Sequence, residues 1–300
     1  FFQKNNNPVP GYKLCCLILF WVPVFSFSQG VSVIEKADKP VSIGSKTSIL
    51  IDSNNRFTPA TIAASDQFIP SKNSIPIFPV VKGTLWVKFS ILNQTDDSTL
   101  FVDLPYANIS SLSFYKQQGD RLLLVKKTGN ALPFEDSKQA TPNFVGKLSI
   151  KKGDSATYFL QLSSKHQVLL PLFIENRDSL DASLGLQELA IGIYMGIMLA
   201  IFLYNLFLCF STNDRSYLIY VIYVLFLSIA QMTLAGYAFK YFWPGYPAIN
   251  DYALPVSSAL AGISGITFAI FFLRTKFYTP KLNPFLFLLI AFYVASIVLS

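Results

Sequence analysis

The sequence predicts an all-β, jelly-roll-like sandwich followed by an α-helical transmembrane bundle that is truncated at residue 300. Charge is distributed unevenly: 32 of the 160 residues from 29 to 188 are charged, against 7 of the 112 residues from 189 to 300. The first region also contains short β-type segments separated by turn residues, whereas the second contains long uncharged runs. A water-soluble part is therefore joined to an apolar part, which excludes a single soluble globular enzyme, a disordered chain and a coiled coil.

The amino-terminal segment has the order of a secretory signal peptide. Lys4 and Lys13 precede an apolar run from Leu14 to Phe27, which ends in the small-residue pattern Ser26-Phe27-Ser28. We therefore expect residues 1–28 to be a signal peptide, with an uncleaved anchor as the alternative. In either case the segment that follows is exported.

Residues 29–185 have the pattern of an exported β-sandwich. Segments rich in β-branched and aromatic residues alternate with Gly, Asn, Asp and Pro turns, and no helical periodicity appears before about residue 181. The region holds no cysteine, so no disulfide stabilises it. The expected strands are Lys46–Asp52, Thr84–Leu92, Thr99–Leu104, Ile109–Lys116, Arg121–Lys127, Thr157–Leu162 and Val168–Glu175.

Residues 186–300 are expected to form transmembrane helices. Four runs without charge, at 189–210, 216–239, 252–273 and 282–300, reach or approach the length that spans a bilayer. The chain starts at Phe1 and stops inside the fourth run, so we expect it to be a fragment of a longer protein.

The loops between these runs predict the orientation of the bundle. If the sandwich is outside, the loop 274–281 is cytoplasmic, and it carries three basic residues and no acid. The outer loop 240–251 carries Tyr and Trp residues that are typical of the membrane interface. Both features agree with the positive-inside rule.

The candidate ligand-binding residues are aromatic. Trp86, Tyr106 and Tyr115 could stack on a sugar, although a Trp in mid-strand is more often a core residue. No metal-binding spacing is present, and His166, the only histidine, lies in a turn-like segment. Without a nucleophile elbow, a P-loop or HExxH, we expect no enzyme activity in these residues and no cofactor.

The candidate signal-coupling residues lie in the first expected helix and in the turn that follows it. Asn205 is a polar residue inside the first run, and Asp214 and Arg215 form the first cytoplasmic turn. Either these two couple neighbouring helices or they cap and pair within a tight turn. The Gly192–Gly196 spacing fits contact between two copies or ordinary close packing inside the bundle. Balanced charge in the soluble part argues against nucleic acid as a partner.

An ordered series of motifs resembles a known family. The series comprises Gly83-Thr84-Leu85-Trp86-Val87-Lys88-Phe89, the strand from Ala156 to Ser164, Leu170-Pro171-Leu172, Gly192-Ile193-Tyr194-Met195-Gly196, Leu203-Tyr204-Asn205-Leu206, the segment from Asn213 to Tyr220, and Tyr241-Phe242-Trp243-Pro244. The order and spacing are similar to those of the 7TMR-DISM proteins, bacterial seven-transmembrane receptors with diverse intracellular signalling modules. The exported part looks like their type-two extracellular domain.

The resemblance implies a carbohydrate-binding jelly roll, seven helices in the inner membrane and a cytoplasmic output domain, such as a histidine kinase or a diguanylate cyclase. It supplies no ligand contacts for individual residues of this chain. The expected function is thus a transmembrane receptor that binds a small ligand outside and relays the signal inward. The alternatives are a transporter with an accessory exported domain, a membrane enzyme with an outward-facing active site, and an anchored carbohydrate-binding module without output.

Overall fold

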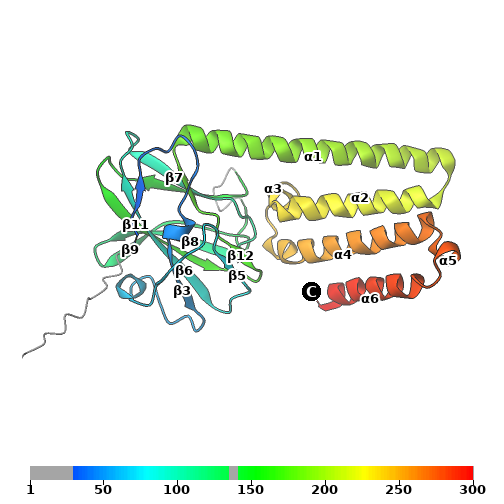
Figure 1. Cartoon of the computed structure of the whole chain (residues 1–300), viewed down its shortest axis with the longest axis horizontal. Helices are drawn as coiled ribbons and strands as arrows, with labels where there is room; N and C mark the ends of the chain where they lie inside the picture. The colour runs from blue at the N-terminus through cyan, green and yellow to red at the C-terminus, as the bar shows by residue number, and fades with distance from the viewer. Residues whose placement is uncertain (1–29, 135–140, 300) are drawn as a thin grey trace, which may run out of the picture.

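The computed structural model describes residues 30–134 and 141–299, and it places a β-sheet-rich domain before a row of helices (Figure 1). The expected signal peptide lies outside the described residues. The fold class predicted from the sequence is confirmed, whereas the jelly-roll strand order within it stays a prediction.

The larger sheet is built around two long central strands, β6 (Thr84–Asn93) and β11 (Ser155–Ser163). Within the described residues it has seven strands, with β1 (Ser32–Ile34) pairing parallel to β6 beside the main order. That order is β4 (Ile69–Pro70), β3 (Ser48–Asp52), β6, β11, β8 (Ser111–Gln118) and β9 (Arg121–Thr128).

A second sheet faces the first. Its order is β10 (Phe144–Ser149), β7 (Thr99–Leu104), β13 (Phe173–Glu175) and β2 (Val41–Ser42). A short pair, β12 (Val168–Leu169) with β5 (Ile77–Phe78), and two 3-10 turns, η1 (Gly44–Lys46) and η2 (Ile62–Ala64), complete the described part of the domain.

The main core lies between the two sheets. Alternate residues of β6, such as Leu85, Val87 and Phe89, meet Leu100 and Val102 of β7 there. Since side chains alternate across a strand, the intervening residues face away from this core. Trp86 of β6 is one of them, and it lies in a second, smaller cluster on the opposite face of the larger sheet.

Four longer helices follow, side by side in one row: α1 (Arg177–Thr212), α2 (Arg215–Leu234), α4 (Pro247–Phe272) and α6 (Asn283–Leu299) (Figure 1). Two short helices connect them, α3 (Tyr237–Tyr241) and α5 (Thr275–Tyr278). Among the described residues, α1, α2 and α4 are long and apolar enough to cross a membrane.

Two helix boundaries differ from those expected. α1 begins at Arg177 rather than at 189, because Asn176 caps it by accepting a hydrogen bond from the Ser179 amide. The run expected to be one helix over 216–239 is divided between α2 and α3. The break is at Gly236, which adopts the left-handed conformation with φ 79°.

Candidate functional site

Trp86 and Tyr115, two of the expected ligand-binding residues, are core residues. The Trp86 side chain is fully buried, and its ring lies 6.0 Å from that of Tyr115 between ring centres. The hydroxyl of Tyr115 donates a hydrogen bond to Gln161 Oε1 at 2.9 Å. Ile62 of η2 belongs to the same buried cluster. Because neither ring offers a face to solvent, we no longer expect either of them to meet a ligand.

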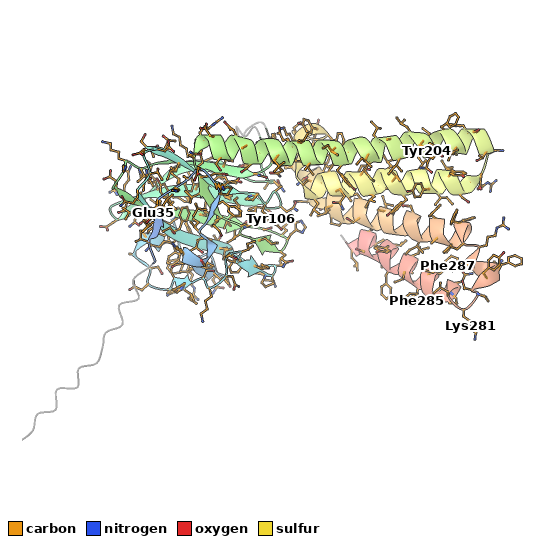
Figure 2. All side chains as sticks on the ribbon, turned by 45° about the horizontal axis from the view of Figure 1, so that its top comes forward. Glu35, Tyr106, Tyr204, Lys281, Phe285 and Phe287 are labelled. Atoms are coloured by element: carbon orange, nitrogen blue, oxygen red, sulfur yellow. The ribbon has the colours of Figure 1, made fainter. Side chains whose placement is uncertain are left out.

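Tyr106, the third candidate, lies elsewhere, at the end of the sandwich that meets the helices (Figure 2). Its hydroxyl donates to the Gln167 carbonyl at 2.6 Å, and partial burial raises the pKa of Tyr106. The residue lines a cavity of about 30 Å³ together with Gly236 of the helical part, which leaves room for about one or two water molecules. The three aromatic candidates therefore do not form one site.

The contact between sandwich and helices is a second region of interest, which we call the junction. The backbone passes close to the sandwich at Gly236, between α2 and α3. A Cβ atom added there would lie 2.5 Å from Ala107 Cβ and 2.8 Å from Pro142 Cβ. Asn108 Nδ2 donates to the Leu234 carbonyl at 3.4 Å beside it. Only glycine allows the turn between α2 and α3 to seat against the sandwich in this way.

The loop after β9 reaches the same place. The backbone amide of Phe134 donates to the Pro244 carbonyl at 2.8 Å, and the Phe134 ring packs edge-to-face on Phe239 with centres 5.9 Å apart. The sandwich is thus joined to α3 and the segment that follows it by its backbone as well as by its side chains.

Polar pairs complete the junction. Lys165 Nζ lies 2.6 Å from Asp251 Oδ2 on α4, and this hydrogen bond raises the pKa of Lys165. Asn143, just before β10, and Gln187, on α1, exchange two side-chain hydrogen bonds, at 2.8 and 3.3 Å. The sandwich therefore contacts α1, the turn between α2 and α3, and α4.

An open polar cleft of about 700 Å³ lies away from the junction on the sandwich. None of the described residues that line it is aromatic, and Lys116, Lys151, Asp154 and Thr157 supply both donors and acceptors. Hydrogen bonding, not ring stacking, is the chemistry that this cleft offers.

Strand β11 connects the cleft with the junction. It begins at Ser155 in the cleft and ends at Ser163, two residues before Lys165. Nine extended residues span about 30 Å. β11 pairs along most of its length with β6 and β8, which makes it a stiff element.

Two family models match this chain. The one described as 7TMR-DISM extracellular 2 matches residues 44–176, and the one described as 7TM diverse intracellular signalling matches residues 187–300. The chain belongs to the 7TMR-DISM family. No curated protein matches it. The resemblance inferred from the sequence is therefore confirmed, and the protein is of the transmembrane receptor type with an extracellular domain.

In this 7TMR-DISM member, the expected coupling residues have local roles. Asn205 Nδ2 donates to the Ile201 carbonyl of its own helix at 2.8 Å. Asp214 caps α2, because its Oδ1 accepts from the Ser216 amide at 2.8 Å, and this bond holds the pKa of Asp214 below its usual value. Arg215, the first residue of α2, forms no ion pair with any described residue.

Sequence reasoning did not find the junction residues. Gly236, Asn143 and Gln187 give no signal as single residues. The cap at Asp214 and the aromatic residues of the loop 240–251 were recognisable from the sequence, but the surface against which that loop packs was not. Across residues 30–134 and 141–299, no group of three or more His, Cys, Asp or Glu side chains is placed to hold a metal ion.

Proposed function

We propose that this chain is the sensing and membrane part of a bacterial receptor of the inner membrane. A small polar ligand, such as a carbohydrate, binds in the cleft at the start of β11. The helices then pass the change to an output domain on the cytoplasmic side, and the residues described here perform no catalysis.

The observation that supports this proposal is the continuity from cleft to helices. β11 runs from the cleft towards Lys165, whose ammonium group pairs with Asp251 on α4. A ligand can shift the bundle only if it binds two arrangements of the protein with different affinity. Because β11 ends at the junction, it provides a physical link between ligand binding in the cleft and the arrangement of the helices.

The test is hydrogen exchange of the full chain in lipid nanodiscs, with a panel of neutral and acidic mono- and oligosaccharides as probes. We expect an active probe to protect residues 149–157 and also to change exchange at residues 234–246, beyond the junction. Protection confined to the sandwich would contradict the relay and would favour an anchored binding module.

A pair of variants separates binding from relay. Asp251→Asn weakens the pair with Lys165 and should reduce the response at 234–246 while leaving protection at 149–157 intact. Asp181→Asn is the matched control, because it removes a carboxylate that pairs only with Arg177 within α1, at 2.7 Å. An equal loss in both variants would contradict a role for the junction pair.

A further inference from the structure

Two carboxylates are buried where the first turns of α1 cover the smaller sheet. Asp103 is on β7 and Glu175 is on β13, and their exposed fractions are 5% and 1%. The strand register pairs Phe101 with Glu175 and Phe173 with Asp103. The two acids are therefore diagonal neighbours on one face of the sheet. It is the face away from the main core, because Leu100, Val102 and Leu104 of β7 point into that core.

The start of α1 covers this face. Glu175 Oε2 accepts hydrogen bonds from Ser179 Oγ at 2.7 Å and Ser183 Oγ at 3.3 Å, both on α1. The Arg177 guanidinium lies 5.8 Å from the centre of the Phe101 ring. Figure 1 shows α1 leaving the sandwich beside β7. Residues 177–186, which lie between the two family matches, thus form the contact between sheet and membrane helix.

The side chains of Asp103 and Glu175 differ in the number of hydrogen-bond donors that they have. Glu175 has two hydroxyl donors and lies at the amino-terminal end of α1, where the helix dipole favours an anion. Asp103 has no side-chain partner in the described residues, and its Oδ1, like Glu175 Oε1, is buried without a hydrogen bond. No salt bridge reaches either group within the described residues.

Positive charge near this face is engaged elsewhere or exposed. Arg177 pairs with Asp181, and Lys147, diagonal to Asp103 through β10, is exposed. The charged residues on the strands and helix packed at this face are Lys147 on β10, Glu175 on β13, and Arg177, Asp178 and Asp181 on the first turns of α1. Two adjacent buried carboxylates without a cation cannot both ionise at low cost.

We propose that Asp103 is a proton-binding site that controls how α1 sits on the sandwich: Asp103 holds a proton while α1 covers it and releases that proton when α1 lifts. A neutral Asp103 leaves Glu175 as the single charge under the helix, satisfied by Ser179 and Ser183. When Asp103 is ionised, two negative charges lie side by side in one buried space. Lifting α1 lowers their electrostatic free energy, because water then reaches both carboxylates.

The electrostatics give the pH window. Burial, with the nearby Glu175 charge as the second cause, outweighs a hydrogen bond with the Leu104 backbone and raises the pKa of Asp103 from 3.8 to about 7 in the seated state. A raised value means that the seated state binds the extra proton. Seating is therefore firmest below about pH 4 and weakens as the pH rises towards 7. Within that window the ratio of lifted to seated α1 changes by up to about tenfold per pH unit.

Hydrogen exchange of the full chain in nanodiscs without ligand tests the proposal. Exchange times are scaled to the intrinsic amide rate at each pH, from about pH 5 to about pH 9. We expect residues 177–186 to lose protection as the pH rises from about 5 to about 7, and to change little above that. Asp103→Asn, which is neutral at every pH, should keep them protected throughout, and Asp120→Asn, in the exposed turn between β8 and β9, should titrate like the unaltered chain.

Glu175→Gln gives a second test. Removing the neighbouring charge should lower the midpoint of the transition without abolishing it, because burial remains the larger cause. The infrared carbonyl band of a protonated carboxyl in the unaltered chain, present below the midpoint and lost above it, provides a reading even if Asp103→Asn does not fold. Protection of 177–186 that is independent of pH, or an unchanged transition in Asp103→Asn, would overturn the proposal. Neither result depends on whether a sugar binds the cleft.

Discussion

Gly236 shows how one residue couples the two parts of the molecule. Its φ of 79° and the nearby Ala107 and Pro142 both exclude a side chain. Gly153 offers a matched comparison, since it has φ 82° with no atom within 4 Å of a Cβ placed there. At both positions the backbone conformation would strain an added side chain, but only at Gly236 would that side chain also clash with neighbouring residues.

Gly153→Ala should therefore cost about 1–2 kcal/mol from backbone strain alone. Gly236→Ala should cost clearly more, because it also forces the turn between α2 and α3 away from the sandwich. The thermal midpoints of the full-length variants in detergent measure both effects. Equal midpoints would mean that the junction does not hold the turn as tightly as the distances indicate.

Trp86 lies in the smaller cluster, on the face of the larger sheet opposite the main core. Its indole Nε1 is buried without a hydrogen-bond partner in the described residues. Its contribution therefore comes from packing with Leu50, Tyr115 and Phe159. Trp86 belongs to the motif Gly83–Phe89, and the sequence alone does not distinguish a structural role for it from ligand binding.

Trp86→Ala should destabilise the chain by about 3–5 kcal/mol through the cavity that it leaves. Trp86→Phe should be much milder, since no hydrogen bond is lost. Leu124→Ala on β9, at a half-exposed side chain, is the surface control and should change stability by less than about 0.5 kcal/mol. A mild Trp86→Ala phenotype with loss of sugar binding would restore the ligand-platform interpretation.

At the scale of elements, the turn between α1 and α2 is the clearest case. Asn213 is in the left-handed conformation that ends α1, and Asp214 begins α2 as its cap. The pKa of Asp214 is lowered first by its bond with Ser216, and the Arg274 charge makes a smaller contribution. Capping is thus its main role in this structure.

Asp214→Ala should lose the cap and destabilise the first turn of α2 by about 1 kcal/mol. Asp214→Asn should retain it, because the amide oxygen also accepts from the Ser216 amide. Hydrogen exchange of residues 215–219 compares the two variants. If both variants fray α2 equally, the charge of Asp214 matters and a coupling role through Arg274 becomes the better explanation.

The strands show where element prediction succeeds. β7 and β9 start at the expected residues, because turn residues flank apolar, β-branched runs. β10 was not expected, since Gly146 interrupts its short pattern. That glycine is needed because a Cβ there would lie 2.9 Å from Val102 Cγ1 and 3.0 Å from Phe114 Cε1.

For the whole molecule, orientation in the membrane is the main testable expectation. The turns between α1 and α2 and around α5 lie at the end of the bundle away from the sandwich (Figure 1). Lys281 lies at this far end (Figure 2). Positive charge there, with an exported sandwich, predicts a cytoplasmic location.

Single cysteines test this orientation in a background with Cys15, Cys16 and Cys209 replaced by Ser. A membrane-impermeant maleimide should label Asp120→Cys, in the turn between β8 and β9, in intact spheroplasts. Lys281→Cys should react only after the membrane is broken. The opposite pattern would reverse the topology and leave the cleft on the cytoplasmic side.

Local patterns in the sequence were enough to predict a β-sheet-rich domain followed by membrane helices, and the family. These follow from charge, hydropathy and turn residues, which act over a few neighbouring positions. The folded structure was needed to show that Trp86 is a core residue, that Gly236 and Lys165 lie at one junction, and that Asp103 meets Glu175 under α1. Such contacts depend on strand register and on which surfaces pack together, and residues far apart in the chain give no local sign of them.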